Sequence, residues 1–100
     1  MLSLPKPMYF VYLLKCKNGT IYTGITTDIE RRFKEHRDGK GGAYTRSRKV
    51  KKVLYTEKYR TRSKAQKREY EIKSWDRDKK LALVLNKKRS RHGGTVFGIN

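Results

Sequence analysis

The sequence predicts one domain of the α/β (α+β) class, with strands and helices in the order β-β-α-β-α-α. Three observations support this prediction. An Asn-Gly pair separates two segments rich in β-branched and aromatic residues. Two Ser/Thr-x-x-Glu/Gln patterns each precede a helical spacing of apolar residues. A further β-rich segment lies between these two helical regions. A chain of 100 residues with 35% hydrophobic residues has material for one small core.

The first two strands are predicted to form a hairpin. Residues 9–15 are an apolar, β-rich run, and residues 20–24 return after the turn at Asn18-Gly19. Asn-Gly is the strongest short hairpin signal, because both residues tolerate a positive φ. We therefore expect two antiparallel strands joined by a tight turn.

A helix is predicted after the hairpin. Thr27 and Glu30 have the spacing of a capping box, in which the threonine hydroxyl accepts from an amide three residues on and the glutamate reaches back. Ile29 and Phe33 are four residues apart, so both are expected to face the core. The helix should end near Arg37, because three glycines follow in the next loop.

The third strand is predicted over residues 51–59, a segment rich in branched and aromatic side chains. Side chains alternate between the two faces of a strand. Val53, Tyr55 and Tyr59 are therefore expected on one face, and Leu54 on the other.

A second helix is predicted from Ser63, which forms another capping box with Gln66, to about Trp75. One face of this helix has two apolar and two acidic side chains, namely Ala65, Glu69, Ile72 and Asp76. A carboxylate among core-facing residues is unusual, so Glu69 is a candidate functional group.

A last helix is predicted to begin at Asp76 or Asp78, either of which can cap it. Its inward-facing residues are expected to be Leu81, Val84 and Leu85. From residue 87 onward the sequence is basic and aperiodic. We therefore predict an N-terminal extension over residues 1–7, a folded domain over 8–86 and a flexible basic tail over 87–100.

The chain is strongly basic. It has 27 Lys and Arg residues against 9 Asp and Glu residues, which gives a net charge of +18, and only four of the cations follow residue 86. The folded body is therefore basic by itself and should attract polyanions. Nucleic acid is the favoured partner on charge alone, and an anionic membrane surface is the alternative.

Cysteine content and hydropathy further narrow the kind of protein and its expected cellular compartment. Cys16 is the only cysteine, so no disulfide forms within one chain and no Cys/His cluster indicates a zinc site. No apolar run approaches the roughly 20 residues of a membrane span, and the N-terminus has no signal-peptide pattern. We expect a cytoplasmic protein with no membrane partner.

Four residues of the predicted hairpin and first helix are candidates for catalysis. Tyr12 and Tyr22 lie in the two strands, although tyrosines also occur in strands for purely structural reasons. Arg32 and His36 lie four residues apart on the flank of the helix. Arg32 fits either a solvated helix cation or a phosphate ligand, and His36 fits either a helix C-terminal position or a site.

Glu69 is the strongest candidate from its chemistry. Hydrolysis of a phosphodiester requires something to offset charge on the phosphate, and a divalent cation does so when the protein supplies a hard oxygen ligand. The alternative is an ion pair of Glu69 with Arg32 or Lys73.

These residues resemble the motifs of the GIY-YIG nuclease domain. That family has a tyrosine ending a first motif in strand one, a Tyr-x-Gly motif in strand two, an arginine on the next helix and a glutamate on a later one. In this sequence the motifs read Phe10-Val11-Tyr12 and Tyr22-Thr23-Gly24, with Arg32 and Glu69 at the later positions. Residues 39–45 are similar to the small stand-alone UPF0213 branch. The resemblance covers about residues 8–85.

The resemblance implies a three-stranded antiparallel sheet flanked by helices, and Mg²⁺- or Mn²⁺-dependent hydrolysis of phosphodiester bonds in DNA, with branched or structured repair substrates among those expected. Glu69 would hold the metal. Tyr12 would be the general base and Tyr22 would place the attacking water, or the two roles would be reversed. Arg32 would stabilise the phosphate charge, and His36 would orient a phosphate or the base.

Contacts to nucleic acid are expected from residues around this site, with DNA ahead of RNA. These residues are Gly24, Tyr44, Arg46, Arg48, Lys49, Lys51, Lys52 and Lys73. The sequence shows no additional DNA-binding domain, so a protein partner for targeting is a further expectation, and a monomer is the default. The alternatives are a non-catalytic nucleic-acid-binding module and a nuclease subunit that needs a partner for activity.

Overall fold

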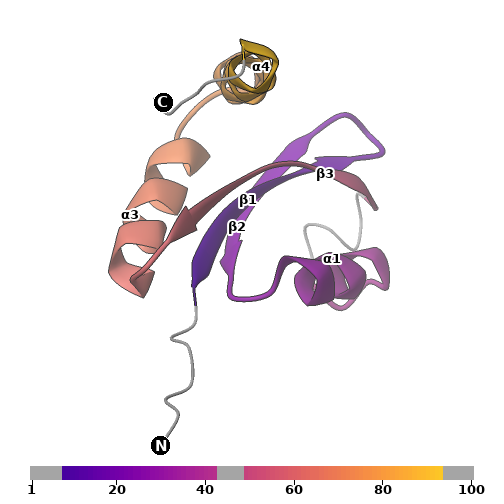
Figure 1. The fold of residues 1–100 in the computed structure, drawn as a ribbon. Helices are drawn as coiled ribbons and strands as arrows, with labels where there is room; N and C mark the ends of the chain where they lie inside the picture. The colour runs from indigo at the N-terminus through magenta and orange to yellow at the C-terminus, as the bar shows by residue number, and fades with distance from the viewer. Residues whose placement is uncertain (1–7, 43–48, 94–100) are drawn as a thin grey trace, which may run out of the picture.

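The computed structural model describes residues 8–42 and 49–93, with side chains described up to Lys87. The observed order of elements is the predicted β-β-α-β-α-α. The elements are β1 (Tyr9–Cys16), β2 (Ile21–Thr26), α1 (Ile29–Arg37), β3 (Val50–Tyr59), α3 (Arg62–Lys73) and α4 (Arg77–Gly93) (Figure 1). None of the described helices is long and apolar enough to cross a membrane.

The three strands form one antiparallel sheet in the order β2-β1-β3, as predicted. β1 is central and pairs with β2 across the Asn18-Gly19 turn, in which Gly19 has φ 89°. The Asn18 side chain accepts a hydrogen bond from the Thr20 amide at 3.1 Å and so stabilises the turn. The hairpin prediction is confirmed.

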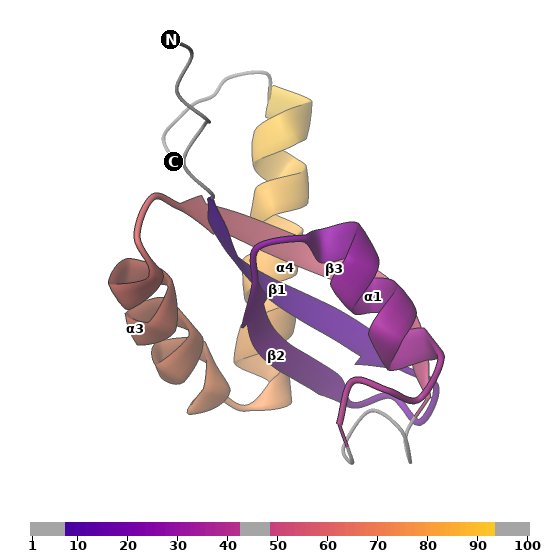
Figure 2. The same cartoon turned by 90° about the horizontal axis from the view of Figure 1, so that it is seen from below.

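Helices lie on both sides of this sheet. Figure 1 shows α1 on one side and α4 on the other, and Figure 2 shows the same arrangement from below. α3 packs on the same side of the sheet as α4. The cluster facing α3 and α4 contains Val11, Leu13, Ile21, Ala65, Ile72 and Val84. The cluster facing α1 contains Tyr12, Leu14, Cys16 and Val50, with Ile29 and Phe33 packed against it. Because side chains alternate along β1, Tyr12 lies on the side of the sheet that α1 covers.

Tyr55 and Tyr59 share a face of β3 as predicted, but Val53 and Leu54 lie on the faces opposite to those predicted, because the strand has a β-bulge. Its register against β1 shifts by one residue at Leu54. Leu54, Tyr55 and Tyr59 therefore all pack on the α3 and α4 side, whereas Val53 packs on the α1 side. One extra residue inverts the alternation that the sequence pattern assumes.

The helix caps differ from the prediction at two of three positions. Asp28, not Thr27, caps α1 and accepts a hydrogen bond at 3.0 Å from the amide three residues on. Thr61, not Ser63, caps α3 in the same way at 3.2 Å. Asp76 accepts from the amide three residues on at 2.9 Å, as predicted for the start of α4. In each case the cap is one of several polar residues available near the boundary, and only the backbone conformation selects among them.

The last helix is longer than the sequence predicts. α4 continues to Gly93, past residue 87, where the sequence becomes basic and aperiodic. It does so because lysine and arginine are good helix formers and no glycine or proline intervenes. Residues 94–100 of the predicted tail lie outside the described part. Leu81 and Val84 pack inward as predicted, whereas Leu85 is 58% exposed.

Candidate active site

Two tyrosines of the hairpin and a histidine of α1 form one aromatic cluster. The ring centroids of Tyr12 and Tyr22 are 6.2 Å apart, and those of Tyr22 and His36 are 5.1 Å apart. The Tyr12 hydroxyl oxygen lies 2.9 Å from His36 Nε2, in a buried hydrogen bond between residues 24 apart in sequence. β1, β2 and α1 thus each contribute one ring.

His36 is buried, with 1% of its surface exposed. Burial, together with the charge of Arg32, lowers the pKa of His36 to about 4, so the imidazole is neutral at pH 7. A neutral imidazole protonated on Nδ1 can accept a hydrogen bond from the Tyr12 hydroxyl at Nε2. Of the two sequence interpretations of His36, the structure favours a place in this cluster.

Gly41 packs directly on the His36 ring. A Cβ at Gly41 would lie 2.7 Å from two ring carbons of His36, so the loop after α1 can close over the imidazole only with a glycine at this position. The sequence prediction did not include Gly41 among the site residues. The run of three glycines after the helix was the available signal, but it does not indicate which of them touches the ring.

Gly24 makes room for Tyr12. The two residues are cross-strand partners, and a Cβ at Gly24 would lie 2.6 Å from the Tyr12 Cζ and closer still to the hydroxyl oxygen. Gly24 is itself buried. The prediction that Gly24 contacts nucleic acid is therefore corrected: it shapes the site from beneath the tyrosine ring.

Gly24→Ala should displace the Tyr12 ring and break its hydrogen bond to His36. We expect at least a tenfold loss of any DNA cleavage and about 1–3 kcal/mol of destabilisation, the usual cost of overpacking. Cleavage rates and thermal denaturation measure the two effects. Tyr12→Phe is the comparison, since it removes the hydroxyl without crowding. Parental cleavage in Gly24→Ala would contradict the assignment of the Tyr12 hydroxyl to the site.

The environment of Tyr12 keeps its phenol protonated. Burial is the largest influence and raises the pKa of Tyr12 to about 12, although a hydrogen bond from Arg32 and its positive charge act in the opposite direction. The charge of Glu69 is the smallest of the named influences and also raises this pKa. Glu69 lies on α3, whose Ala65 and Ile72 pack in the core on the other side of the sheet.

Arg32 is held from two sides. Its Nη1 donates to Glu35 at 2.8 Å and its Nη2 donates to the Gly41 carbonyl at 3.1 Å. The side chain remains 30% exposed, so the guanidinium can also contact a ligand. The sequence analysis missed Glu35, although its i+3 spacing from Arg32 on a helix is the signal for such a pair.

Glu69 forms an ion pair with Lys73, one of the two partners that the sequence suggested. Its carboxylate lies 3.3 Å from Lys73 Nζ, and the two side chains are 18% and 50% exposed. An ion pair with a half-exposed lysine is weak, so the carboxylate oxygens remain available to a cation. No group of three or more His, Cys, Asp or Glu side chains within the described residues is arranged to hold a metal. A single carboxylate fits Mg²⁺, which commonly keeps several waters and takes one or two protein carboxylates.

The structure separates the basic residues predicted to contact nucleic acid. Lys49 lines a pocket with His36 at the C-terminal end of α1, and Lys51 is exposed on β3. Lys52 instead lines a groove with residues of α4, on the side of the sheet away from Tyr12. Lys73 pairs with Glu69. The remaining predicted contacts, Tyr44, Arg46 and Arg48, lie outside the described residues.

Comparison with known proteins adds a family match. Residues 8–82 match the model of the GIY-YIG catalytic domain. UPF0213 proteins of Staphylococcus saprophyticus and Staphylococcus aureus are 46% identical over 76 residues, which are 76% of this chain and 93% of each relative.

Two solved structures are also similar to this chain. The solution NMR structure of the UPF0213 protein BH0048 from Bacillus halodurans has 44% identity and a TM-score of 0.53, over 80% of this chain and 85% of that one. The solution NMR structure of EF2693 from E. faecalis has 35% identity and a TM-score of 0.59, over 95% of this chain and 97% of that one. The names of these relatives state no substrate.

Proposed function

Because this chain belongs to the GIY-YIG family, whose domain is a nuclease domain, we propose that it is an endonuclease that hydrolyses phosphodiester bonds in DNA with one divalent metal ion. The observation that carries the proposal is the buried hydrogen bond between Tyr12 and His36, with the Arg32 guanidinium and the Glu69 carboxylate both acting on the same hydroxyl. A constellation of a base, a proton acceptor, a fixed cation and a carboxylate fits phosphodiester hydrolysis.

Arg32 stabilises negative charge on the scissile phosphate. Its contacts to Glu35 and to the Gly41 carbonyl fix the guanidinium before substrate binds. A donor fixed in advance loses little energy to reorganisation as charge develops, and such stabilisation is usually the largest catalytic contribution.

Tyr12 acts as the general base. His36 Nε2, which is neutral and 2.9 Å away, accepts a hydrogen bond from the Tyr12 hydroxyl and so orients the phenol. The phenol has a pKa of about 12, so the positive charges of Arg32 and of a bound divalent ion would be needed to favour the phenolate that accepts the proton of water. Tyr22, whose ring is 6.2 Å from that of Tyr12, orients the water.

Glu69 would hold the divalent ion, Mg²⁺ or Mn²⁺, with water and phosphate oxygens completing its coordination. When bound, the ion supplies positive charge that offsets the charge of the phosphate and lowers the pKa of water. The half-exposed Lys73 is free to release Glu69 at little energetic cost. The basic surface, including Lys49 and Lys51, contacts the DNA backbone.

A non-catalytic nucleic-acid-binding module is the second candidate, and the net charge of +18 favours it. A binding module has no need of a neutral histidine that forms a hydrogen bond with a buried tyrosine. The buried Tyr12–His36 pair is therefore the observation that favours the enzyme.

The test is cleavage by the purified protein. Labelled junction, flap, single-stranded and blunt duplex DNAs are incubated with Mg²⁺ or Mn²⁺, and with EDTA as the control. We expect internal cleavage of at least one substrate with metal and none with EDTA. Binding without cleavage of every substrate, with both metals, would support the binding module instead.

A further inference from the structure

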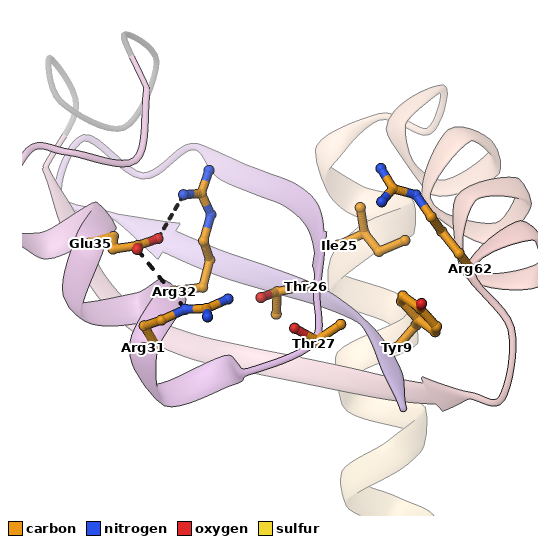
Figure 3. A pocket seen from close by; sticks show the side chains of 8 residues that line it. All are labelled: Tyr9, Ile25, Thr26, Thr27, Arg31, Arg32, Glu35 and Arg62. Atoms are coloured by element: carbon orange, nitrogen blue, oxygen red, sulfur yellow. Dashed lines mark hydrogen bonds and ion pairs between the residues drawn. The ribbon is translucent and has the colours of Figure 1, made fainter. Parts of the chain in front are cut away.

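A second feature adjoins the candidate active site. A pocket of about 280 Å³ opens between α1 and the N-terminal end of α3 (Figure 3). Thr26 and Thr27, where β2 turns into α1, lie between its two walls. One wall comes from α1 and the other from β1, β2 and α3. The α1 wall consists of Arg31, Arg32 and Glu35, and the other of Tyr9, Ile25 and Arg62.

The charges around this pocket favour an anion. The Glu35 carboxylate forms ion pairs with two arginines, at 4.0 Å from Arg31 Nε and 2.8 Å from Arg32 Nη1. Arg62 on the opposite wall has no carboxylate partner among the described residues. Three guanidinium groups therefore face one carboxylate, and guanidinium groups suit phosphate oxygens because their donors are planar and paired.

The size and the aromatic wall favour a single nucleotide. A volume of about 280 Å³ is slightly below the usual range for small-molecule pockets, so it suits a ligand of the size of one nucleotide unit. Tyr9 is half-buried and lies on the same wall as Arg62. A tyrosine ring stacks on any base, as in proteins that bind single strands.

The pocket is continuous with the candidate active site, because Arg32 belongs to both. We propose that it binds one unpaired nucleotide next to the scissile phosphate, with the base against Tyr9 and a phosphate between Arg31 and Arg62. The proposal rests on the proposed nuclease function and defines its substrate class as DNA with a single-stranded segment at the cleavage site. A continuous duplex would have to turn a base out of its stack, and this unstacking opposes binding.

The test measures binding in EDTA, so that it does not depend on cleavage. Fluorescence anisotropy at one fixed salt concentration compares a labelled single strand with the blunt duplex of the same sequence. The variants are Tyr9→Leu and Arg62→Gln. The controls are Tyr9→Phe, which keeps the ring, and Lys67→Gln, which removes one exposed positive charge from the same helix as Arg62 outside the pocket.

We expect Tyr9→Leu and Arg62→Gln to weaken single-strand binding about fivefold or more and to change duplex binding no more than Lys67→Gln does. Tyr9→Phe should bind as the parent does. Circular dichroism melting confirms that each variant is folded. An equal loss for single strand and duplex, or no loss for either, would overturn the proposal. Because binding is measured without metal, a failure here is distinct from a failure of the parent to cut DNA.

Discussion

We expect the replacement of Glu69 with glutamine to abolish DNA cleavage and to leave metal-free DNA binding intact. Glutamine keeps the shape of the side chain, which is 18% exposed, but removes the charge that a divalent ion needs. We expect the initial cleavage rate to fall at least about 100-fold, as when one charge-stabilising group is removed from an active site. Binding in EDTA should be equal or tighter, because one acid that repels phosphate is gone.

Glu71→Gln is the matched control for this experiment. Glu71 lies on the same helix, its side chain is 56% exposed, and it pairs with Arg68. The same substitution there should leave cleavage within about twofold of the parent. Equal cleavage by Glu69→Gln and the parent would show that the observed activity is a contaminant or that the site is misassigned.

The largest expected effect on stability comes from Arg68→Ala. Arg68 Nε and Nη2 donate to the two carboxylate oxygens of Glu57 at 2.9 and 3.0 Å, and the two side chains are only 23% and 14% exposed. The hydroxyls of Tyr55 and Tyr59 donate to the same carboxylate. Removing Arg68 leaves the charge of Glu57 largely buried without its cation. We expect a loss of about 3 kcal/mol in the free energy of unfolding, near the lower end for breaking a buried pair.

Urea denaturation measures this loss, and Lys67→Ala is the control. Lys67 is exposed on the same helix, so its replacement should change the free energy of unfolding by no more than about 0.5 kcal/mol. A loss for Arg68→Ala as small as that of the control would mean that the pair contributes nothing to folding. Because Arg68 precedes Glu69 and ties α3 to β3, the pair also positions the helix that supplies the carboxylate.

Acidity should reduce the difference between Arg68→Ala and the parent. Burial by itself raises the pKa of Glu57, but hydrogen bonds from Arg68, Tyr55 and Tyr59 outweigh it and hold the pKa below the ordinary 4.5. The stabilisation from an acid with a lowered folded-state pKa is complete above the unfolded-state pKa and is lost as pH falls through the folded-state pKa. The free energies of unfolding of Arg68→Ala and of the parent should therefore converge as the pH falls through this lowered folded-state pKa.

The sequence by itself determined the elements and most of the candidate cluster. Asn18-Gly19 fixes the hairpin, and the four-residue spacing of Arg32 and His36 places both on one flank of α1. The helical stripe of α3 also singled out Glu69. The predictions of the hairpin and of the helices succeeded because each depends on spacing within a single element, and spacing of that kind is written directly in the sequence.

Only the tertiary structure decided which groups meet. The strand register sets Tyr12 over Gly24, the loop after α1 brings Gly41 onto His36, and the bulge at Leu54 places Tyr55 on the side of α3. The pocket beside Arg32 likewise draws on β1, β2, α1 and α3. A bulge, a register and the closure of a loop depend on packing between distant segments, so no local pattern of residue types predicts them.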